Sequence, residues 1–288
     1  MKKKRYNIAI ILAIFVLFSV VFYNNNKYIK TTKDFVHGSA ETPEGTTIVV
    51  SMFVSDKNYT WDQTSADDLN TISNIRDYLA IAGDYIEADA ASYDKKATFI
   101  TDFESNDDLA YYIDVDIDME DENDGIDETI WAYIDKNINV NSLMREYKAD
   151  NVVFMAIMNT DTDCKAITCT RNWYENMPYP YEIVYLYNID SELVNPPAVY
   201  AHEIYHTFGA PDLYTADEYF NIDDTVLDYF YNNLSNDIML TCSDPDSLDY
   251  VYDKITNETT ELTAYYIGLT DTSMVATKLG LTGNQHLD

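Results

Sequence analysis

The sequence contains little cysteine, few basic residues and few histidines. Its 288 residues include three cysteines, which are too few for a disulfide scaffold. Lysine and arginine number 18 against 50 aspartates and glutamates, so the formal net charge is −32. Phosphate contacts need clustered basic side chains, and this composition therefore excludes nucleic acid as a partner.

Apolar and aromatic residues are plentiful by comparison. Hydrophobic residues make up 47% of the chain, which has 26 tyrosines and 11 phenylalanines. This content is sufficient for a hydrophobic core, and it excludes a disordered acidic tail. From residue 47 onward we expect one domain of about 240 residues.

The N-terminal segment has the opposite charge from the rest of the chain. The first 33 residues contain seven basic residues and no acidic one, and an apolar run extends from Ile8 to Phe22. A basic region followed by an apolar run is typical of a secretory signal, but no small-residue cleavage site follows. Residues 1–23 are therefore predicted to be a signal anchor, or else a signal peptide, that contacts the membrane. Residues 24–46 are polar and are predicted to form a tether.

Either kind of signal would place the domain outside the cytoplasm, because basic flanking residues stay on the cytoplasmic side. The protein is therefore expected to be secreted or anchored to the outer face of the cytoplasmic membrane. Disulfides are permitted there. Cys164 and Cys169 are close enough in sequence to close a short loop, and pairing of Cys242 with either of them is equally open.

Strands and helices alternate in the first half of the domain, which indicates an α/β fold. β-Branched and apolar runs predict strands, and a stripe of apolar residues predicts a long helix after Ser65. The expected strands span residues 47–55, 97–103, 111–119, 151–158, 166–170 and 182–187, and the expected helices span 66–91, 127–138 and 141–149.

Two of the four histidines, His202 and His206, are four positions apart in the sequence. They lie in a segment that begins after Pro196 and ends at Gly209. Proline is tolerated in the first helical turn and glycine favours a helix end, so the segment is predicted to be a helix. Residues four apart lie on one helical face, where both imidazoles can bind one metal ion. Glu203 lies about 100° around the helix from His202, in the position of a general base that acts on water at the metal.

A catalytic zinc ion needs a third protein ligand and one open position. Gly209 allows the chain to turn back toward the helix, so Asp212 is expected to be the third ligand. Asp217 and Glu218 are the alternatives for this position.

The HExxHxxGxxD pattern from His202 to Asp212 resembles that of the metzincin zinc peptidases, in the variant with aspartate as third ligand. The extension GAPDLY is most similar to the immune inhibitor A family of bacterial secreted metallopeptidases. The sequence Asp237-Ile238-Met239 resembles the metzincin Met-turn, in which Met239 would lie beneath the metal. Residues 261–269 resemble a helix that follows in that family.

This resemblance implies a zinc endopeptidase with one catalytic zinc ion per chain and a protein or peptide substrate. It also implies a zincin fold with a mixed, mostly parallel twisted sheet and an antiparallel edge strand, packed on helices that include the zinc-binding helix. The catalytic domain would span residues 47–288, with an upper part at 47–209 and a mainly helical lower part at 210–288. Substrate would pair with the edge strand, which chain order places near residues 166–171.

The sequence also departs from the family pattern. Tyr205 stands where the family usually has glycine, and Thr241 stands where some metzincins have a tyrosine that stabilises the transition state. Tyr265 or Tyr266 is the alternative donor, and Tyr265 is the one we expect.

The acidic segment from Asp114 to Glu128 does not fit an EF-hand loop, because Trp131 occupies the position of the final glutamate. A solvated strand face with an acidic loop is the favoured interpretation, and Ca²⁺ bound in another geometry stays open because immune inhibitor A relatives bind it. Two other functions were also considered: a catalytically inactive zincin that serves as a binding module, and a calcium-stabilised acidic surface protein. The intact Glu203 argues against the inactive zincin.

Overall fold

The computed structural model describes residues 39–121, 124–171 and 181–287. The predicted signal segment at 1–23 and most of the predicted tether lie outside these residues. Within the described part of the chain, none of the helices has both the length and the apolar character that a membrane span requires.

A six-stranded sheet forms the centre of the fold, with strand order β2-β1-β4-β6-β5 and with β3 also paired to β1. Five strands are mutually parallel, whereas the edge strand β5 runs antiparallel to β6. The strands are β1 (Gly45–Ser55), β2 (Ala97–Ile100), β3 (Ala110–Asp114), β4 (Asn151–Met158), β5 (Cys169–Arg171) and β6 (Ile183–Tyr187). The predicted α/β fold with a mostly parallel sheet is thus confirmed.

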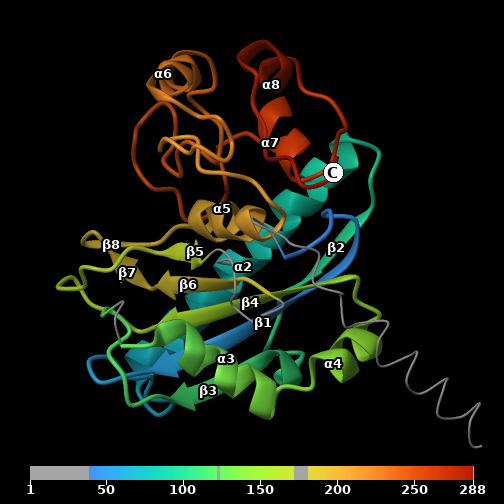
Figure 1. Cartoon of the computed structure of the whole chain (residues 1–288). Coiled ribbons are helices and arrows are strands. Elements are labelled where there is room, and N and C mark those ends of the chain that lie inside the picture. Colours follow the sequence, from blue (N-terminus) through green and yellow to red (C-terminus); the bar gives the residue numbers. More distant parts are fainter. Residues whose placement is uncertain (1–38, 122–123, 172–180, 288) are drawn as a thin grey trace, which may run out of the picture.

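The described residues form seven α-helices, of which α6, α7 and α8 lie beyond α5, away from the sheet (Figure 1). They are α2 (Ala66–Ser92), α3 (Ile126–Asn137), α4 (Val140–Tyr147), α5 (Pro197–Thr207), α6 (Asp224–Asn233), α7 (Glu261–Tyr266) and α8 (Met274–Leu279). A 3-10 turn, η1 (Asp107–Leu109), and a short hairpin of β7 (Ile189–Asp190) and β8 (Leu193–Val194) complete the elements. In Figure 1, α5 lies on one side of the sheet and α3 and α4 lie on the other.

The central strands are buried because helices or loops cover both of their faces. Every residue of β4 is buried, as are the last nine of β1, and this explains their uninterrupted apolar sequences. Helix α2 begins at its N-cap Ser65, whose side chain accepts a hydrogen bond from the amide of Asp68. Helix α2 has a buried stripe that includes Ile75 and Leu79, and this helix packs against α5.

A buried polar network fixes α5 against α2. The hydroxyl of Tyr205 donates to Asp89 Oδ2 at 2.6 Å, and the Thr259 hydroxyl donates to the same carboxylate. Tyr85 is hydrogen-bonded to Thr259 at 2.9 Å. The fully buried ring of Tyr205 thus packs between α5 and α2, and its hydroxyl joins α5 to α2 and to the C-terminal part.

The end of the predicted tether is part of the domain. The amide of Ala40 donates to Thr207 O at 2.8 Å, and the amide of Glu41 donates to Asn151 Oδ1 at 2.9 Å. Ala40 is buried, and β1 already begins at Gly45. Residues 39–46 therefore pack with the domain that was predicted from residue 47, because long-range hydrogen bonds hold these polar residues.

The strands β2 and β3 are shorter than expected, because β1 pairs with each of them along only part of its length. β1 pairs with β2 as far as Ile48 and with β3 from Ser51 onward, so β2 ends at Ile100. β3 ends at Asp114 because β1 itself ends at Ser55 and turns. The regular alternation of residues 111–119 therefore does not continue as a strand.

The lower part of the domain is less helical than expected. Residues 210–287 contain only α6, α7 and α8, and turns and loops connect them. Side chains such as Asp217 and Asp244 accept backbone amides in these loops, which stabilises turns in place of helices. Cys164, Cys169 and Cys242 form no disulfide in the described structure, so none of the pairings that the sequence left open is made there.

Candidate metal centre

Local sequence signals set both ends of α5, the helix that carries the histidines. Pro197 occupies the first helical turn, where a missing amide costs no hydrogen bond. Gly209 follows the helix with a φ of +102°, and a β-carbon there would lie 2.8 Å from the Gln285 side chain. Glycine is therefore required at this bend, and the bend returns the chain to the helix.

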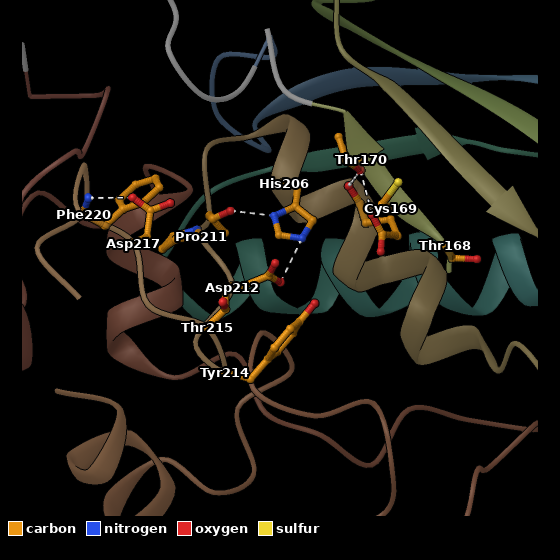
Figure 2. Close-up of a pocket in the computed structure, with 12 residues that line it drawn as sticks. Thr168, Cys169, Thr170, His206, Pro211, Asp212, Tyr214, Thr215, Asp217 and Phe220 are labelled. Carbon is orange, nitrogen blue, oxygen red and sulfur yellow. Dashed lines mark hydrogen bonds and ion pairs between the residues drawn. The ribbon is translucent and has the colours of Figure 1, made fainter. Parts of the chain in front are cut away.

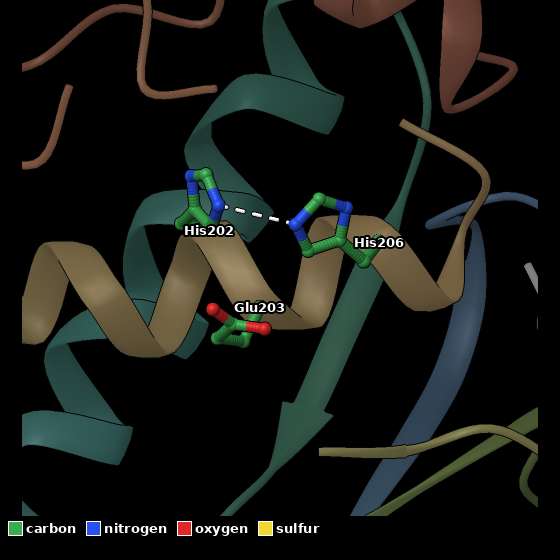
Figure 3. A group of neighbouring side chains, drawn as sticks. All are labelled: His202, Glu203 and His206. Carbon is green, nitrogen blue, oxygen red and sulfur yellow. Dashed lines mark hydrogen bonds between the residues drawn. The ribbon is translucent and has the colours of Figure 1, made fainter. Parts of the chain in front are cut away.

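Three potential ligand atoms converge next to α5. His202 Nε2 and His206 Nε2 are 3.1 Å apart. Asp212 Oδ1 lies 3.2 Å from each of these nitrogens. Figure 3 shows the two imidazoles facing each other from adjacent turns of α5, and Figure 2 shows Asp212 reaching His206 from the returning chain. The structure thus brings together the three residues that the sequence predicted as ligands.

Hydrogen bonds to backbone carbonyls determine which ring nitrogens carry hydrogen. His202 Nδ1 lies 2.8 Å from Ile238 O, and His206 Nδ1 lies 2.8 Å from Ala210 O. Because carbonyl oxygens only accept, each Nδ1 is the donor, and in the neutral imidazole each Nε2 carries a lone pair. Asp212 Oδ1 is buried and lies at ion-pair distance from both Nε2 atoms. Three electron-pair donors therefore point toward one place.

This donor set fits a zinc ion. Nitrogen and oxygen ligands bind zinc at about 2.0–2.1 Å in a tetrahedral arrangement, which separates the ligand atoms by about 3.3 Å. The observed separations are 3.1, 3.2 and 3.2 Å. Two imidazoles and one carboxylate are also ligands that zinc prefers, and they leave a fourth position open. His202, His206 and Asp212 would hold the ion.

The charges of the three side chains are strongly coupled. Burial alone would raise the pKa of Asp212, but the charges and hydrogen bonds of His206 and His202 hold that pKa well below its usual range. Burial lowers the pKa of His206, but Asp212 outweighs burial, so the pKa lies above its usual value. Without a metal ion the site therefore keeps a proton to a higher pH than a free imidazole would, and a cation would displace that proton.

The segment at 237–241 is hydrogen-bonded to one of the two histidines, His202. Its Ile238 carbonyl accepts the hydrogen of His202 Nδ1, and its Met239 carbonyl accepts the amide of Leu213, next to Asp212. Asp237 is fully buried and accepts the amide of Met239 at 2.7 Å. The segment that resembles a Met-turn thus contacts both a predicted ligand and the loop that carries another.

Glu203 is 4% exposed and adjoins the imidazole pair. Potential ligand atoms of Glu203, His202 and His206 all lie within 4.8 Å of one another. The shorter distances to Asp212 Oδ1 favour that residue as third ligand and leave Glu203 beside the ion. The hydroxyl of Thr170, on β5, donates to Glu203 Oε2 at 2.8 Å and so fixes its carboxylate.

A pocket open to solvent lies over these groups, with an empty volume of about 510 Å³ that includes open solvent. One wall is the edge of the sheet at residues 168–170, and the base is formed by Glu203 and His206 on α5. The opposite wall is the segment 210–220, which follows the glycine bend (Figure 2). The pocket thus connects the candidate metal centre with solvent.

Tyr214 is a pocket residue that the sequence analysis did not select. Its ring stacks on His202, with ring centroids 6.2 Å apart and 19° between the planes. Burial and the neighbouring carboxylate of Asp212 raise the pKa of Tyr214, so the hydroxyl stays protonated at neutral pH. Its position two residues after Asp212 was the signal that could have identified it.

Tyr265, which we expected to be the hydrogen-bond donor, lies elsewhere. It belongs to α7 and packs edge-on against Tyr266. It is not among the residues that line the pocket. The expectation came from position along the chain, whereas the bend at Gly209 brings Tyr214 to the site.

Among the described residues, no other group of histidine, cysteine or acidic side chains is arranged to hold a metal ion. In the acidic segment from Asp114 to Glu128, the Asp124 carboxylate accepts the amide of Asp118 and pairs with Lys57. Asp217, an alternative third ligand from sequence, lines the pocket, whereas Glu218 is exposed and does not.

No model of a known protein family matches this chain, and no curated protein is similar to it in sequence.

Proposed function

We propose that this protein is a zinc-dependent endopeptidase of the metzincin type, with a motif most similar to that of the immune inhibitor A family. The observation that carries the proposal is the convergence of His202 Nε2, His206 Nε2 and Asp212 Oδ1 beside the carboxylate of Glu203. Three ligands with an open fourth position are typical of catalytic zinc, whereas structural zinc sites are closed by four protein ligands.

The arrangement of the elements supports a zincin fold. The helix α5 lies beside a mostly parallel sheet with an antiparallel edge strand, and the chain reverses at Gly209 to present Asp212. In the turn that contains Met239, the Ile238 carbonyl then accepts a hydrogen bond from His202 Nδ1. These features follow the order along the chain that the metzincin resemblance implies.

Zinc bound here would act as a Lewis acid, which lowers the pKa of a coordinated water to about 7 and polarises a scissile carbonyl. The protein supplies the proton transfers. Glu203 accepts the proton of the attacking water and then passes it to the leaving amine. Because Thr170 occupies Oε2, these transfers fall to the other oxygen of the Glu203 carboxylate.

Tyr214 supplies a hydrogen bond to the reacting carbonyl oxygen. Its raised pKa keeps the phenol protonated, and stacking on His202 limits the positions that its ring can take. A fixed donor directed at developing negative charge lowers the barrier without reorganisation during the reaction. Tyr214 therefore takes the role for which the sequence offered Tyr265.

The substrate is a protein or peptide that pairs with the edge strand β5. Among the described residues this strand pairs with β6 alone, and it forms one wall of the pocket. An extended peptide added to a sheet edge gains main-chain hydrogen bonds in register with the strand. The scissile bond would then lie over His206 and Glu203. The basic and apolar N-terminal sequence supports action outside the cytoplasm, either in secreted form or at the membrane surface.

The test measures metal content and proteolysis of the full chain. Purified protein should contain one tightly bound zinc ion per chain and should hydrolyse casein. The Glu203→Ala variant should keep its zinc and lose hydrolysis by at least about 1,000-fold, because removal of a general base affects chemistry and not metal binding. A protein that holds zinc but cleaves nothing in a broad peptide library would be a binding module, and a protein without zinc would refute the proposal.

A further inference from the structure

The pocket contains a third carboxylate, which neither metal binding nor proton transfer uses. Asp217 lines the same pocket as Asp212 and Glu203. Figure 2 shows Asp217 and Phe220 on the opposite side of His206 from Cys169 and Thr170. The carboxylate therefore lies on the side of the pocket away from the edge strand.

A tight turn holds this carboxylate in place. Asp217 Oδ1 accepts the amides of Tyr219 at 2.8 Å and Phe220 at 3.3 Å. The main chain of Asp217 and Ile222 closes the turn with two further hydrogen bonds. The side chain is thus fixed before any ligand binds, which reduces the entropy cost of recognition.

The pocket has excess negative charge. Its lining includes Glu203, Asp212 and Asp217, and among the described residues no lysine or arginine lines it. A divalent ion at the metal centre would balance two of these three charges. The basic residue of the edge strand, Arg171, lies over the Tyr185 ring and 3.8 Å from Asp127, outside the pocket. One charge is therefore left for a ligand to neutralise.

The surroundings of Asp217 suit a long basic side chain. Pro211 and Phe220 give apolar lining at the same end of the pocket. Lysine and arginine place their methylene stems on such surfaces while the charged group reaches a carboxylate. We propose, on the basis of the endopeptidase function above, that Asp217 recognises a lysine or arginine side chain of the peptide substrate and so determines cleavage specificity.

The decisive measurement compares peptides that differ in one residue. Internally quenched peptides with lysine, glutamine or glutamate are scanned through the positions that flank the cleaved bond. At one position kcat/KM should be about 10-fold higher for lysine than for glutamine, as expected for a hydrogen-bonded charge pair, and lowest for glutamate. In Asp217→Asn the ratio of lysine to glutamine should fall to about 2 or less. Asparagine keeps the Oδ1 acceptor, so the turn is preserved.

The control separates a local contact from attraction by the whole protein. A net charge of −32 also attracts cationic peptides, but this effect is spread over the surface and is screened by salt. Glu218→Gln removes the same charge from the exposed neighbour outside the pocket, and it should leave the lysine ratio unchanged. The preference for lysine over glutamine could instead be lost in 0.5 M salt, or could fall equally in both variants. Either result would assign the preference to the overall charge and overturn the inference.

A binding measurement keeps this inference distinct from the proposed activity. Zinc-loaded Glu203→Gln protein is titrated by calorimetry with the lysine and glutamine peptides, with and without Asp217→Asn. The lysine peptide should bind about 10-fold more tightly, and only when Asp217 is present. Cleavage without a lysine preference would refute the role of Asp217 but not the hydrolase function. Binding with the expected preference but no cleavage by the wild type refutes the hydrolase and keeps the recognition site.

Discussion

Thr170 and Glu203 connect the edge of the sheet with the metal-binding helix. The Thr170 hydroxyl lies 2.8 Å from Glu203 Oε2 and 3.0 Å from the main-chain oxygen of the same residue. The residue that a bound peptide would lie beside is therefore also the one that orients the general base. In the proposed reaction, this one side chain would couple substrate pairing at β5 to proton transfer at α5.

Replacement of Thr170 by valine should lower kcat and leave zinc content unchanged. Valine keeps the shape and the β-branch of threonine but leaves a buried carboxylate oxygen without its donor. We expect kcat to fall about 10-fold, because the carboxylate is no longer held in one orientation. Steady-state kinetics with a quenched peptide, together with metal analysis, measures both quantities.

Thr170→Ser is the matched control, since serine restores the hydroxyl without the methyl group. It should recover most of the lost kcat. Equal losses in both variants would mean that the side chain matters for packing in β5 and not for Glu203.

Asp212→Asn should weaken zinc binding strongly. The neutral amide is a poor metal ligand and removes the charge that compensates the ion. Loss of an outer partner costs about 10- to 100-fold in metal affinity, and loss of a ligand should exceed this. Competition with a chromophoric chelator gives the affinity. Asp217→Asn is the control within the same pocket, and zinc affinity close to wild type is expected for it. A large loss in Asp217→Asn and none in Asp212→Asn would exchange the two assignments.

Zinc binding should release protons and weaken as the pH falls. The pKa of His206 is raised above 6.5 in the metal-free chain, where Asp212 outweighs the lowering effect of burial, so the site keeps its proton to a higher pH than a free imidazole would. That proton stabilises the metal-free fold below pH 6.5, and its contribution is lost as the pH rises through the raised pKa. Calorimetry in buffers of different ionisation enthalpy should show at least one proton released per zinc ion at pH 7. Affinity that does not change between pH 6 and 7.5 would contradict this coupling.

Local sequence signals identified the parts of the site that depend on neighbours along the chain. The ends of α5 follow from Pro197 and Gly209, and the buried run of β4 was predicted with its observed bounds, Asn151–Met158. Helical spacing placed His202 and His206 on one face, because that relation depends only on the helix itself.

Features that depend on tertiary contacts were not accessible in this way. The end of β3 is determined by where β1 ends, and the buried position of Ala40 depends on Thr207, far away in the chain. Thr170 gave no signal because its partner is on another element. The stacking of Tyr214 on His202 depends on the path of the chain after Gly209, and composition alone does not distinguish this residue among 26 tyrosines.

Tyr214→Phe should lower kcat while KM and zinc content change little. Only the hydroxyl is removed, and the ring that stacks on His202 is retained. A donor that acts on the transition state contributes about 10- to 100-fold in kcat here, near or below the range seen for oxyanion-hole donors. Tyr265→Phe is the control, because that side chain lies outside the pocket and should have wild-type kinetics. A loss in Tyr265→Phe without one in Tyr214→Phe would return the role to α7.

Asp237 should be essential for both stability and zinc affinity, although it is not a ligand. Its buried carboxylate accepts the amide of Met239 at 2.7 Å and the hydroxyl of Thr263 at 2.8 Å, and Thr260 donates to it from both its amide and its hydroxyl. These bonds hold the turn that presents the Ile238 carbonyl to His202. In Asp237→Asn, one acceptor oxygen becomes an amide group that faces donors.

We expect Asp237→Asn to lower the free energy of unfolding of the metal-free protein by about 2–3 kcal/mol, the cost of unsatisfied buried groups. Urea denaturation measures this loss, and the exposed Asp228→Asn on α6 should change stability by less than about 0.5 kcal/mol. Zinc affinity should also fall about 10- to 100-fold, as for other residues that orient a ligand. If stability falls but zinc affinity is unchanged at a temperature where the variant is folded, then Asp237 supports only the fold, and the Ile238 carbonyl does not depend on it to orient His202.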